Sequence, residues 1–222
     1  MRWPGCRAGL RETGRMVRRL IQLYLGVALY GFSLALTVRA NLGLSPWDVF
    51  HQGVAQRIGW RIGTVLIVTS LAVLLLWIPL RQRPGLGTIS NAVLVGVAMN
   101  ATLDVLPPAQ TWWWRAILLV AGVVLNGFAT AAYIGARLGP GPRDGLMTGL
   151  VGRTGRSVRL IRTGIEVVVL AIGWLLGGTV GIGTLAYAFG IGPITHFFMP
   201  LLVAPQKPPP QVDPEHSAPA ND

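Results

Sequence analysis

Cysteine, acidic residues and charge in general are scarce in this chain. Only one of its 222 residues is a cysteine, Cys6, so neither an internal disulfide nor a cluster of thiolate metal ligands is available. Charged residues make up 12% of the chain, about half the share of an average soluble domain. The sequence also lacks a His-x-x-x-His pattern and a Ser/His pair at a plausible spacing. We therefore expect no metal, no cofactor and no enzymatic activity.

Apolar residues are abundant instead, at 52% of the chain. They form six runs that approach or exceed the ~20 residues that an α-helix needs to cross a bilayer. The 19 Lys and Arg residues fall between these runs rather than along one helix face, so the bilayer is the expected partner and nucleic acid is not. The six runs are residues 20–38, 62–80, 86–106, 113–136, 158–176 and 182–203.

The sequence repeats itself after 96 residues, as the pairs Gly43/Gly139 and Asp48/Asp144 illustrate. The same offset, without a gap, also matches Gly31-Phe32 with Gly127-Phe128, Pro46 with Pro142, Arg57 with Arg153, and Gly85, Gly87 and Thr88 with Gly181, Gly183 and Thr184. Two halves of common descent follow from this pattern. The first apolar run corresponds to the fourth, so we expect it to be a structural helix rather than a removable signal.

These features predict four regions along the chain. Residues 1–16 form a basic disordered tail, residues 17–106 the first membrane repeat, residues 107–204 the second, and residues 205–222 a proline-rich disordered tail.

Three apolar runs in each half are an odd number of crossings, which would turn the second half upside down relative to the first. The expected fold is an all-α membrane protein of six transmembrane helices, built as two inverted three-helix repeats, each with a short extra helix between its first and second spans. With both termini in the cytoplasm, 15 of the 19 cationic residues lie on the inside. That asymmetry agrees with the positive-inside rule and with a plasma (inner) membrane location.

The link after the first run of each half predicts a short helix. Ser45 is a suitable N-cap, Pro46 fits the first helical position, and Asp48 is placed like a capping acid, so a helix should run to about Arg57. In the second half Asp144 keeps the place of Asp48. Such helices are too short to span, so each is either interfacial or re-entrant. The two aspartates accordingly either cap their helices or meet near the midplane, where they would bind a cation or a polar solute.

Glu166 lies about nine residues inside the fifth run, ~14 Å deep if that run spans the bilayer. Arg162, one turn earlier on the same face, is its expected partner. An acid at that depth is costly unless paired or protonated, which leaves a transport pathway and a structural ion pair as alternatives. Asn100 and His196 occupy equivalent places in the two halves and are candidates either for the pathway or for hydrogen bonds between helices.

Three segments resemble a known family of bacterial membrane proteins, the YczE/YyaS/YitT group. They are Asn41–Asp48, Pro84–Thr88 and Gly139–Leu146. The similarity covers nearly all of residues 17–204. It implies a multi-pass membrane location and fold, and it brings no catalytic residue with it.

Two functions remain in competition at this point. Inverted repeats with paired short helices are typical of transporters, which predicts a small-solute or ion pathway at the repeat interface. Its candidate residues are Asp48, Asp144, Arg162, Glu166, Asn100 and His196. The alternative is a non-transporting accessory or anchoring protein that assists a cytoplasmic enzyme or assembly through the basic link 143–162. The sequence leaves the oligomeric state open.

Overall fold

The computed structural model describes residues 5–203, with side chains from residue 14 onward, and this part of the chain contains eight α-helices and no strand. Their bounds are α1 (Gly5–Ala40), α2 (Pro46–Ile58), α3 (Ile62–Trp77), α4 (Leu86–Val105), α5 (Trp112–Gly135), α6 (Pro142–Thr154), α7 (Val158–Leu175) and α8 (Ile182–Leu202). All six apolar runs and both short links are helical, as the sequence predicts.

The helix pattern repeats with the sequence. α2, α3 and α4 begin at Pro46, Ile62 and Leu86, and α6, α7 and α8 each begin 96 residues later. α2 and α6 have the same length of 13 residues, and both end at a glycine in the left-handed conformation, Gly59 and Gly155. The short helix predicted after the first run is therefore present in both halves, and the two halves follow the same local path.

The beginning of the chain differs from the expectation. α1 starts at Gly5, so residues 5–16, which were expected to be disordered, are helical. The chain has no proline between Pro4 and Pro46, and Arg, Leu and Ala favour helix, so α1 continues backwards without interruption to 36 residues. The basic composition of this segment led to the prediction of disorder, although its residues favour helix. Residues 1–4 of the same tail and the predicted tail 205–222 lie outside the described residues.

Four helices are long and apolar enough to cross a membrane: residues Gly14–Ala40 of α1, and α4, α5 and α8. α2 and α3, bent by 113° at their junction, would together make a fifth. α3 alone has only 16 residues, and α7 carries Arg159, Arg162 and Glu166. The predicted number of six spans therefore stays a prediction.

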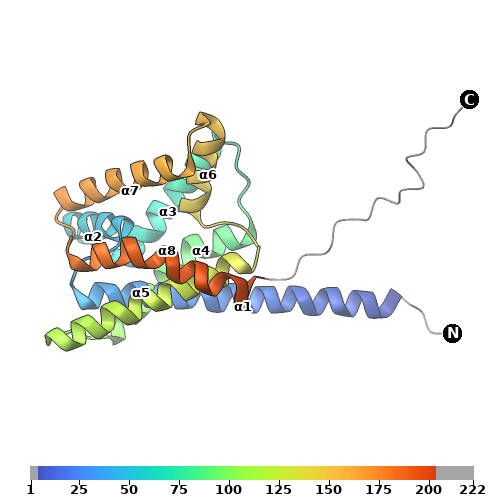
Figure 1. The fold of residues 1–222 in the computed structure, drawn as a ribbon, viewed down its shortest axis with the longest axis horizontal. Coiled ribbons are helices and arrows are strands. Elements are labelled where there is room, and N and C mark those ends of the chain that lie inside the picture. Colours follow the sequence, from blue (N-terminus) through green and yellow to red (C-terminus); the bar gives the residue numbers. More distant parts are fainter. Residues whose placement is uncertain (1–4, 204–222) are drawn as a thin grey trace, which may run out of the picture.

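The two halves are interleaved rather than side by side (Figure 1). α1 and α5 lie along one another, with α4 on α1 and α8 on α5. Each short helix packs on a long helix of the other half: α2 on α7, and α6 on α3. Each short helix therefore packs more on the other half than on its own.

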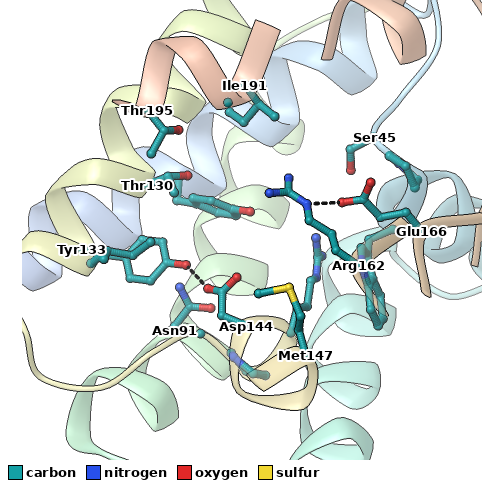
Figure 2. A pocket seen from close by; sticks show the side chains of 18 of the residues that line it. Ser45, Asn91, Thr130, Tyr133, Asp144, Met147, Arg162, Glu166, Ile191 and Thr195 are labelled. Carbon is teal, nitrogen blue, oxygen red and sulfur yellow. Dashed lines mark hydrogen bonds and ion pairs between the residues drawn. The ribbon is translucent and has the colours of Figure 1, made fainter. Parts of the chain in front are cut away.

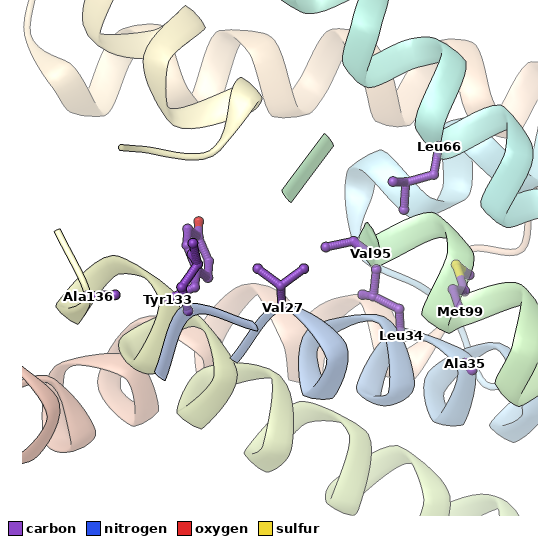
Figure 3. Packing of buried hydrophobic residues seen from close by; sticks show 9 residues of the cluster. Val27, Leu34, Ala35, Leu66, Val95, Met99, Tyr133 and Ala136 are labelled. Carbon is purple, nitrogen blue, oxygen red and sulfur yellow. The ribbon is translucent and has the colours of Figure 1, made fainter. Parts of the chain in front are cut away.

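The main apolar core lies between α1, α3, α4 and α5 (Figure 3). Its centre is aliphatic, with Leu23, Val27 and Leu34 of α1 fully buried. These residues contact the buried side chains of Leu66, Val95, Met99 and Tyr133. Burying a side chain of this size contributes about 1.5–3 kcal/mol, so this cluster holds the first half against α5.

The links between helices gather at two ends of the molecule. At one end Gln22 of α1 donates hydrogen bonds to the carbonyl oxygens of Ala132 in α5 and Leu202 in α8, at 2.9 and 2.6 Å. The amide of Gly87, at the start of α4, donates to the carbonyl of Leu138 in the α5–α6 link, at 2.8 Å. The start of α4, the end of α5 and the end of α8 are thereby grouped near the first part of α1.

The other end of the molecule groups the remaining links. Arg39, 17 residues beyond Gln22 and thus about 26 Å along α1, donates to the carbonyl of Leu103 near the end of α4. The amide of Ala109 in the α4–α5 link donates to the carbonyl of Arg39 at 3.3 Å. The amide of Gly183, at the start of α8, donates to the carbonyl of Leu42 at 2.8 Å.

Candidate functional site

A cavity of about 410 Å³ lies where the two halves meet (Figure 2). Its walls are the first turns of α2 and α6, the last two turns of α5 and the facing sides of α7 and α8, with single residues of α1, α3 and α4. α7 and α8 barely touch each other, unlike their counterparts α3 and α4, and the cavity occupies the space between them. The volume is in the range of small-molecule sites.

The start of α2 forms a closed polar network at the cavity wall. Ser45 caps the helix, its hydroxyl oxygen accepting from the Asp48 amide at 3.3 Å and its hydroxyl donating to the Asp48 carboxylate. His51 Nδ1 lies 3.4 Å from the same carboxylate, and both side chains are 1% exposed. Ser45 lines the cavity, whereas Asp48 lies just behind it. Ser45 is therefore the residue that caps α2, and Asp48 holds its hydroxyl in place; neither of the two interpretations of Asp48, as a cap or as part of a solute site, is settled by these contacts.

The start of α6 differs from that of α2 because Gly141 offers no capping side chain. Asp144 lines the cavity and turns instead toward α5, where its Oδ2 accepts a hydrogen bond from the Tyr133 hydroxyl at 2.8 Å (Figure 2). Within residues 14–203, no Arg, Lys or His nitrogen lies within 4.0 Å of this carboxylate. Asp144 therefore faces the cavity without a cationic partner.

Arg143 lines the cavity from the same first turn of α6. Its guanidinium carbon lies 4.9 Å from the ring centroid of Trp47, and its Nη2 is 3.9 Å from Asp48 Oδ1. It donates no hydrogen bond to any described residue, although its side chain is only 23% exposed. The sequence analysis missed Arg143 because it counted this residue only among the arginines of the basic link. The available signal was its place, directly after the proline that starts α6.

Arg162 and Glu166 form the predicted pair, with Arg162 Nε donating to Glu166 Oε1 at 2.9 Å. Both line the cavity from α7, and Figure 2 shows their side chains across from Asp144. Their side chains are 55% and 36% exposed, so the pair contributes little to folding stability. The corresponding residues of α3 are Leu66 and Ser70, so only the second half carries this charge pair.

Asn100 and His196 have different surroundings despite their equivalent places. Asn100 joins α4 to α3, accepting from the Gly63 amide at 3.0 Å and donating to Thr64 Oγ1 at 3.2 Å. It does not line the cavity, so its role is the predicted hydrogen bond between helices. His196 lines the cavity and is exposed. The structure thus brings Asp144, Arg162, Glu166 and His196 together, with Asp48 adjacent.

Tyrosines form much of the remaining wall. Tyr30 and Tyr133 meet edge to face, with ring centroids 5.8 Å apart, and the Tyr187 hydroxyl donates to Asn126 Oδ1 at 2.9 Å. Thr195 also lines the cavity, and its hydroxyl oxygen is buried without a hydrogen-bond partner in the described chain. In the sequence, each of these positions can be recognised as a polar residue within an apolar run. The sequence alone does not predict that their side chains line the same cavity.

Metal binding was not expected from the sequence. In the part of the chain that the structure describes, no group of three His, Cys, Asp or Glu side chains is placed to hold a metal ion. The polar groups that line the cavity are two arginines, two carboxylates, the His196 imidazole, the Asn91 amide, and the hydroxyls of serine, threonine and tyrosine.

Comparison with known proteins finds relatives that share most of the chain. A model for a family of unknown function, DUF6198, matches residues 17–200. An uncharacterised protein of Haemophilus influenzae is 38% identical over 81% of this chain and 83% of its own. Two proteins of Bacillus subtilis also match: the uncharacterised membrane protein YczE, at 35% identity over 83% of this chain and 87% of its own, and the uncharacterised protein YyaS, at 26% over 80% and 90%. No solved structure matches.

These relatives confirm the predicted resemblance to YczE and YyaS, while the likeness to YitT stays a prediction. A relative named as a membrane protein and several long apolar helices place the chain among multi-pass membrane proteins.

Proposed function

This chain belongs to DUF6198, a family of unknown function, and we propose that it transports a small solute or ion through a site at the interface of its two halves. The observation that carries the proposal is the cavity of about 410 Å³ between the first turns of α2 and α6. An inverted pair of short helices whose first turns meet at a shared polar cavity is a frequent design of transporter sites.

The proposal includes a topology of six crossings with mirror-oriented halves, both termini in the cytoplasm and the plasma (inner) membrane as location. It is supported by the grouping of links at two ends of the molecule, with the first part of α1 and the end of α8 at the same end. It is also supported by charge, because Arg39, Arg57, Arg61 and Arg115 are the only cations that this topology places outside. α3 and α7 would then supply the two remaining crossings, with α7 at the edge of the molecule, where Gly173 is its one buried residue.

The polar lining of the cavity supports transport over a purely structural role. Polar side chains that only connect helices are expected to have their hydrogen bonds filled within the protein. Asn100 of α4 is an example, because it bonds to Gly63 and Thr64 of α3. The cavity instead contains Asp144 without a cation and Thr195 without a hydrogen-bond partner among the described residues. Buried polar groups that lack partners in the protein favour a solute or water as their partner.

The test is flux through sealed vesicles that contain the purified full-length protein, with neutral, anionic, cationic and zwitterionic solutes as the panel. We expect flux of at least one class, reduced about tenfold or more by Glu166→Gln, because that change leaves Arg162 without its partner at the cavity. The matched control is Asp104→Asn, which removes an acid from the exposed Arg61–Asp104 pair far from the cavity. Background flux for every class, or equal loss in the control, would reject the proposal.

A second candidate is the accessory role, in which the protein moves no solute and anchors a cytoplasmic partner. It is favoured by Arg156 and Arg159, whose exposed side chains make no hydrogen bond or ion pair in the described chain and lie beside Arg153. In this case, neutralising Arg153, Arg156 and Arg159 together would abolish recovery of a partner from crosslinked cells, and vesicle flux would be absent.

A further inference from the structure

The two consecutive residues that open α6, Arg143 and Asp144, carry opposite charges and face different walls of the cavity. The Arg143 guanidinium lies over Trp47 of α2, and the Asp144 carboxylate accepts from Tyr133 of α5. No ion pair within 4.0 Å joins them. A positive and a negative group are therefore held side by side at the cavity without forming an ion pair.

Arg143 has unused hydrogen-bond donors. A guanidinium offers five N–H groups, and none of those of Arg143 reaches an acceptor among the described residues. The nearest carboxylate oxygen, Asp48 Oδ1, is 3.9 Å away, which is beyond hydrogen-bonding distance. Asp48 already accepts from Ser45 and lies close to His51, so Arg143 is free to bind a planar anionic group from the cavity.

Asp144 has unused acceptor capacity. An ionised carboxylate can accept about four hydrogen bonds, and the Tyr133 hydroxyl supplies one. Within residues 14–203, no Arg, Lys or His nitrogen lies within 4.0 Å of the Asp144 carboxylate, whereas Glu166 already accepts from Arg162 at 2.9 Å. Asp144 therefore faces the cavity without an ion pair, and the Tyr30 and Tyr133 rings beside it suit an ammonium group.

These contacts discriminate between classes of ligand. A simple anion would fill the donors of Arg143 but would lie next to the unneutralised carboxylate of Asp144. A simple cation would neutralise Asp144 but leave the Arg143 donors unfilled. A ligand with both charges satisfies both groups and adds no net charge to a partly buried cavity, where unpaired charge is costly.

We propose that the cavity binds a small zwitterionic solute, with its ammonium group against Asp144 and its carboxylate on Arg143. The inference rests on the proposed function only in taking the cavity as the solute site. The lining side chains Met147 of α6 and Ile191 and Met199 of α8 offer an apolar surface for the body of such a solute.

The experiment is calorimetric titration of the full-length protein in lipid nanodiscs. The zwitterionic probes are glycine, β-alanine, γ-aminobutyrate, L-leucine and L-phenylalanine, which vary the charge separation and the apolar body. The probe that binds best is compared with its amide, which keeps only the ammonium, and its N-acetyl derivative, which keeps only the carboxylate. We expect the zwitterion to bind about tenfold or more tightly than either, because each analogue loses a charge-assisted contact.

Variants assign the two ends of the ligand. Asp144→Asn should remove the preference over the N-acetyl derivative, and Arg143→Gln the preference over the amide, while Arg143→Lys retains part of it. These preferences are ratios within one preparation, so a smaller folded fraction does not change them. Asp104→Asn, at the exposed Arg61 pair, should leave both ratios unchanged.

Absence of binding by every zwitterion would overturn the inference. Equal affinity for the amide would show an organic-cation site, and equal affinity for the N-acetyl derivative an anion site, and either result would also overturn it. The vesicle assay separates this failure from that of transport. Glu166-dependent flux of another solute class without zwitterion binding rejects only the substrate class, and zwitterion binding without any flux rejects only transport.

Discussion

The two halves of the chain begin from the same helix pattern, but the last two helices of each half are arranged differently. α3 lies tightly along α4, because Gly63 and Gly96 bring the two backbones into contact. In the second half the residue equivalent to Gly63 is Arg159, and Gly192, equivalent to Gly96, has nothing near its Cβ position. α7 and α8 are consequently parted, and the cavity lies between them. The first half thus closes on itself, and the second leaves the space in which the cavity between the halves lies.

The contacts that the two short helices make with the other half are also built differently. Where α3 meets α6, the large Trp77 of the long helix lies against Gly145 of the short one. Where α2 meets α7, Gly173 of the long helix lies against the backbone of Val49 and Phe50. Trp77 corresponds to Gly173, and Gly145 to Val49. One interface is therefore filled by a large side chain, and the other is a close approach of two backbones.

The largest expected effect is at the Trp77–Gly145 interface. Trp77 is 2% exposed, packs with Val73 and Leu146, and donates from Nε1 to the Pro142 carbonyl at 3.1 Å. Trp77→Ala should lower the free energy of unfolding by about 3–5 kcal/mol because it leaves a cavity and a lost hydrogen bond. Chemical denaturation in detergent measures it.

Trp174→Ala is the control for this prediction, since Trp174 is 65% exposed on α7. We expect it to change the free energy of unfolding little. Equal effects of the two substitutions would mean that the α3–α6 contact does not hold the halves together.

The next prediction compares equivalent glycines in the two halves. A Cβ on Gly96 would collide with the Gly63 carbonyl and with Ile67, so Gly96→Ala should destabilise the protein by about 1–3 kcal/mol. Gly192→Ala meets no atom and, because alanine favours helix, should be neutral or slightly stabilising. Thermal denaturation of both variants measures the two changes in stability. A harmless Gly96→Ala would remove the difference in closure between the halves.

A smaller effect is expected at the starts of the short helices. Ser45→Ala removes the side chain that caps α2 and the bond to Asp48, and should cost about 1 kcal/mol. Gly141→Ala removes no cap from α6 and should cost less, provided that the Tyr133 hydroxyl, 3.0 Å from the new Cβ, shifts slightly. Unfolding of the two variants under identical conditions is the measurement. A larger loss at Gly141 would contradict the assignment of unequal caps.

The smallest effect on stability is expected at the charge pair that only the second half carries. Glu166→Gln should change the free energy of unfolding by less than about 1 kcal/mol, because Arg162 and Glu166 are 55% and 36% exposed at their side chains. Vesicle flux should fall in the same variant. A large loss of stability would indicate a structural ion pair, the alternative that the sequence left open.

The sequence predicted the local structure well because its signals are local. Apolar runs, the Ser45-Pro46-Asp48 start of α2 and the (i, i+4) spacing of Arg162 and Glu166 each fix a helix or a contact within a few residues. The repeat offset then transfers these assignments to the second half. The helical start of α1 was missed because composition suggested a solvated tail.

The site was only partly predictable, since its membership depends on how the halves pack. Asn100 and His196 are equivalent in sequence. The Asn100 amide forms hydrogen bonds with Gly63 and Thr64, whereas His196 faces the cavity. The difference arises because α3 closes on α4 and α7 does not close on α8. No local sequence pattern predicts that the N–H donors of Arg143 lack hydrogen-bond acceptors, because this depends on how Trp47 and Asp48 of the other half are placed.

The central claim is that the two halves face opposite sides of the membrane. Trp60 and Arg156 are equivalent, exposed and free of side-chain hydrogen bonds in the described chain, so each tolerates a cysteine in a Cys6→Ser background. Labelling of intact cells and of inverted vesicles with a membrane-impermeant maleimide compares Trp60→Cys with Arg156→Cys. The account predicts that Trp60→Cys is labelled only from outside and Arg156→Cys only from the cytoplasmic side. Labelling of both from the same side would contradict it.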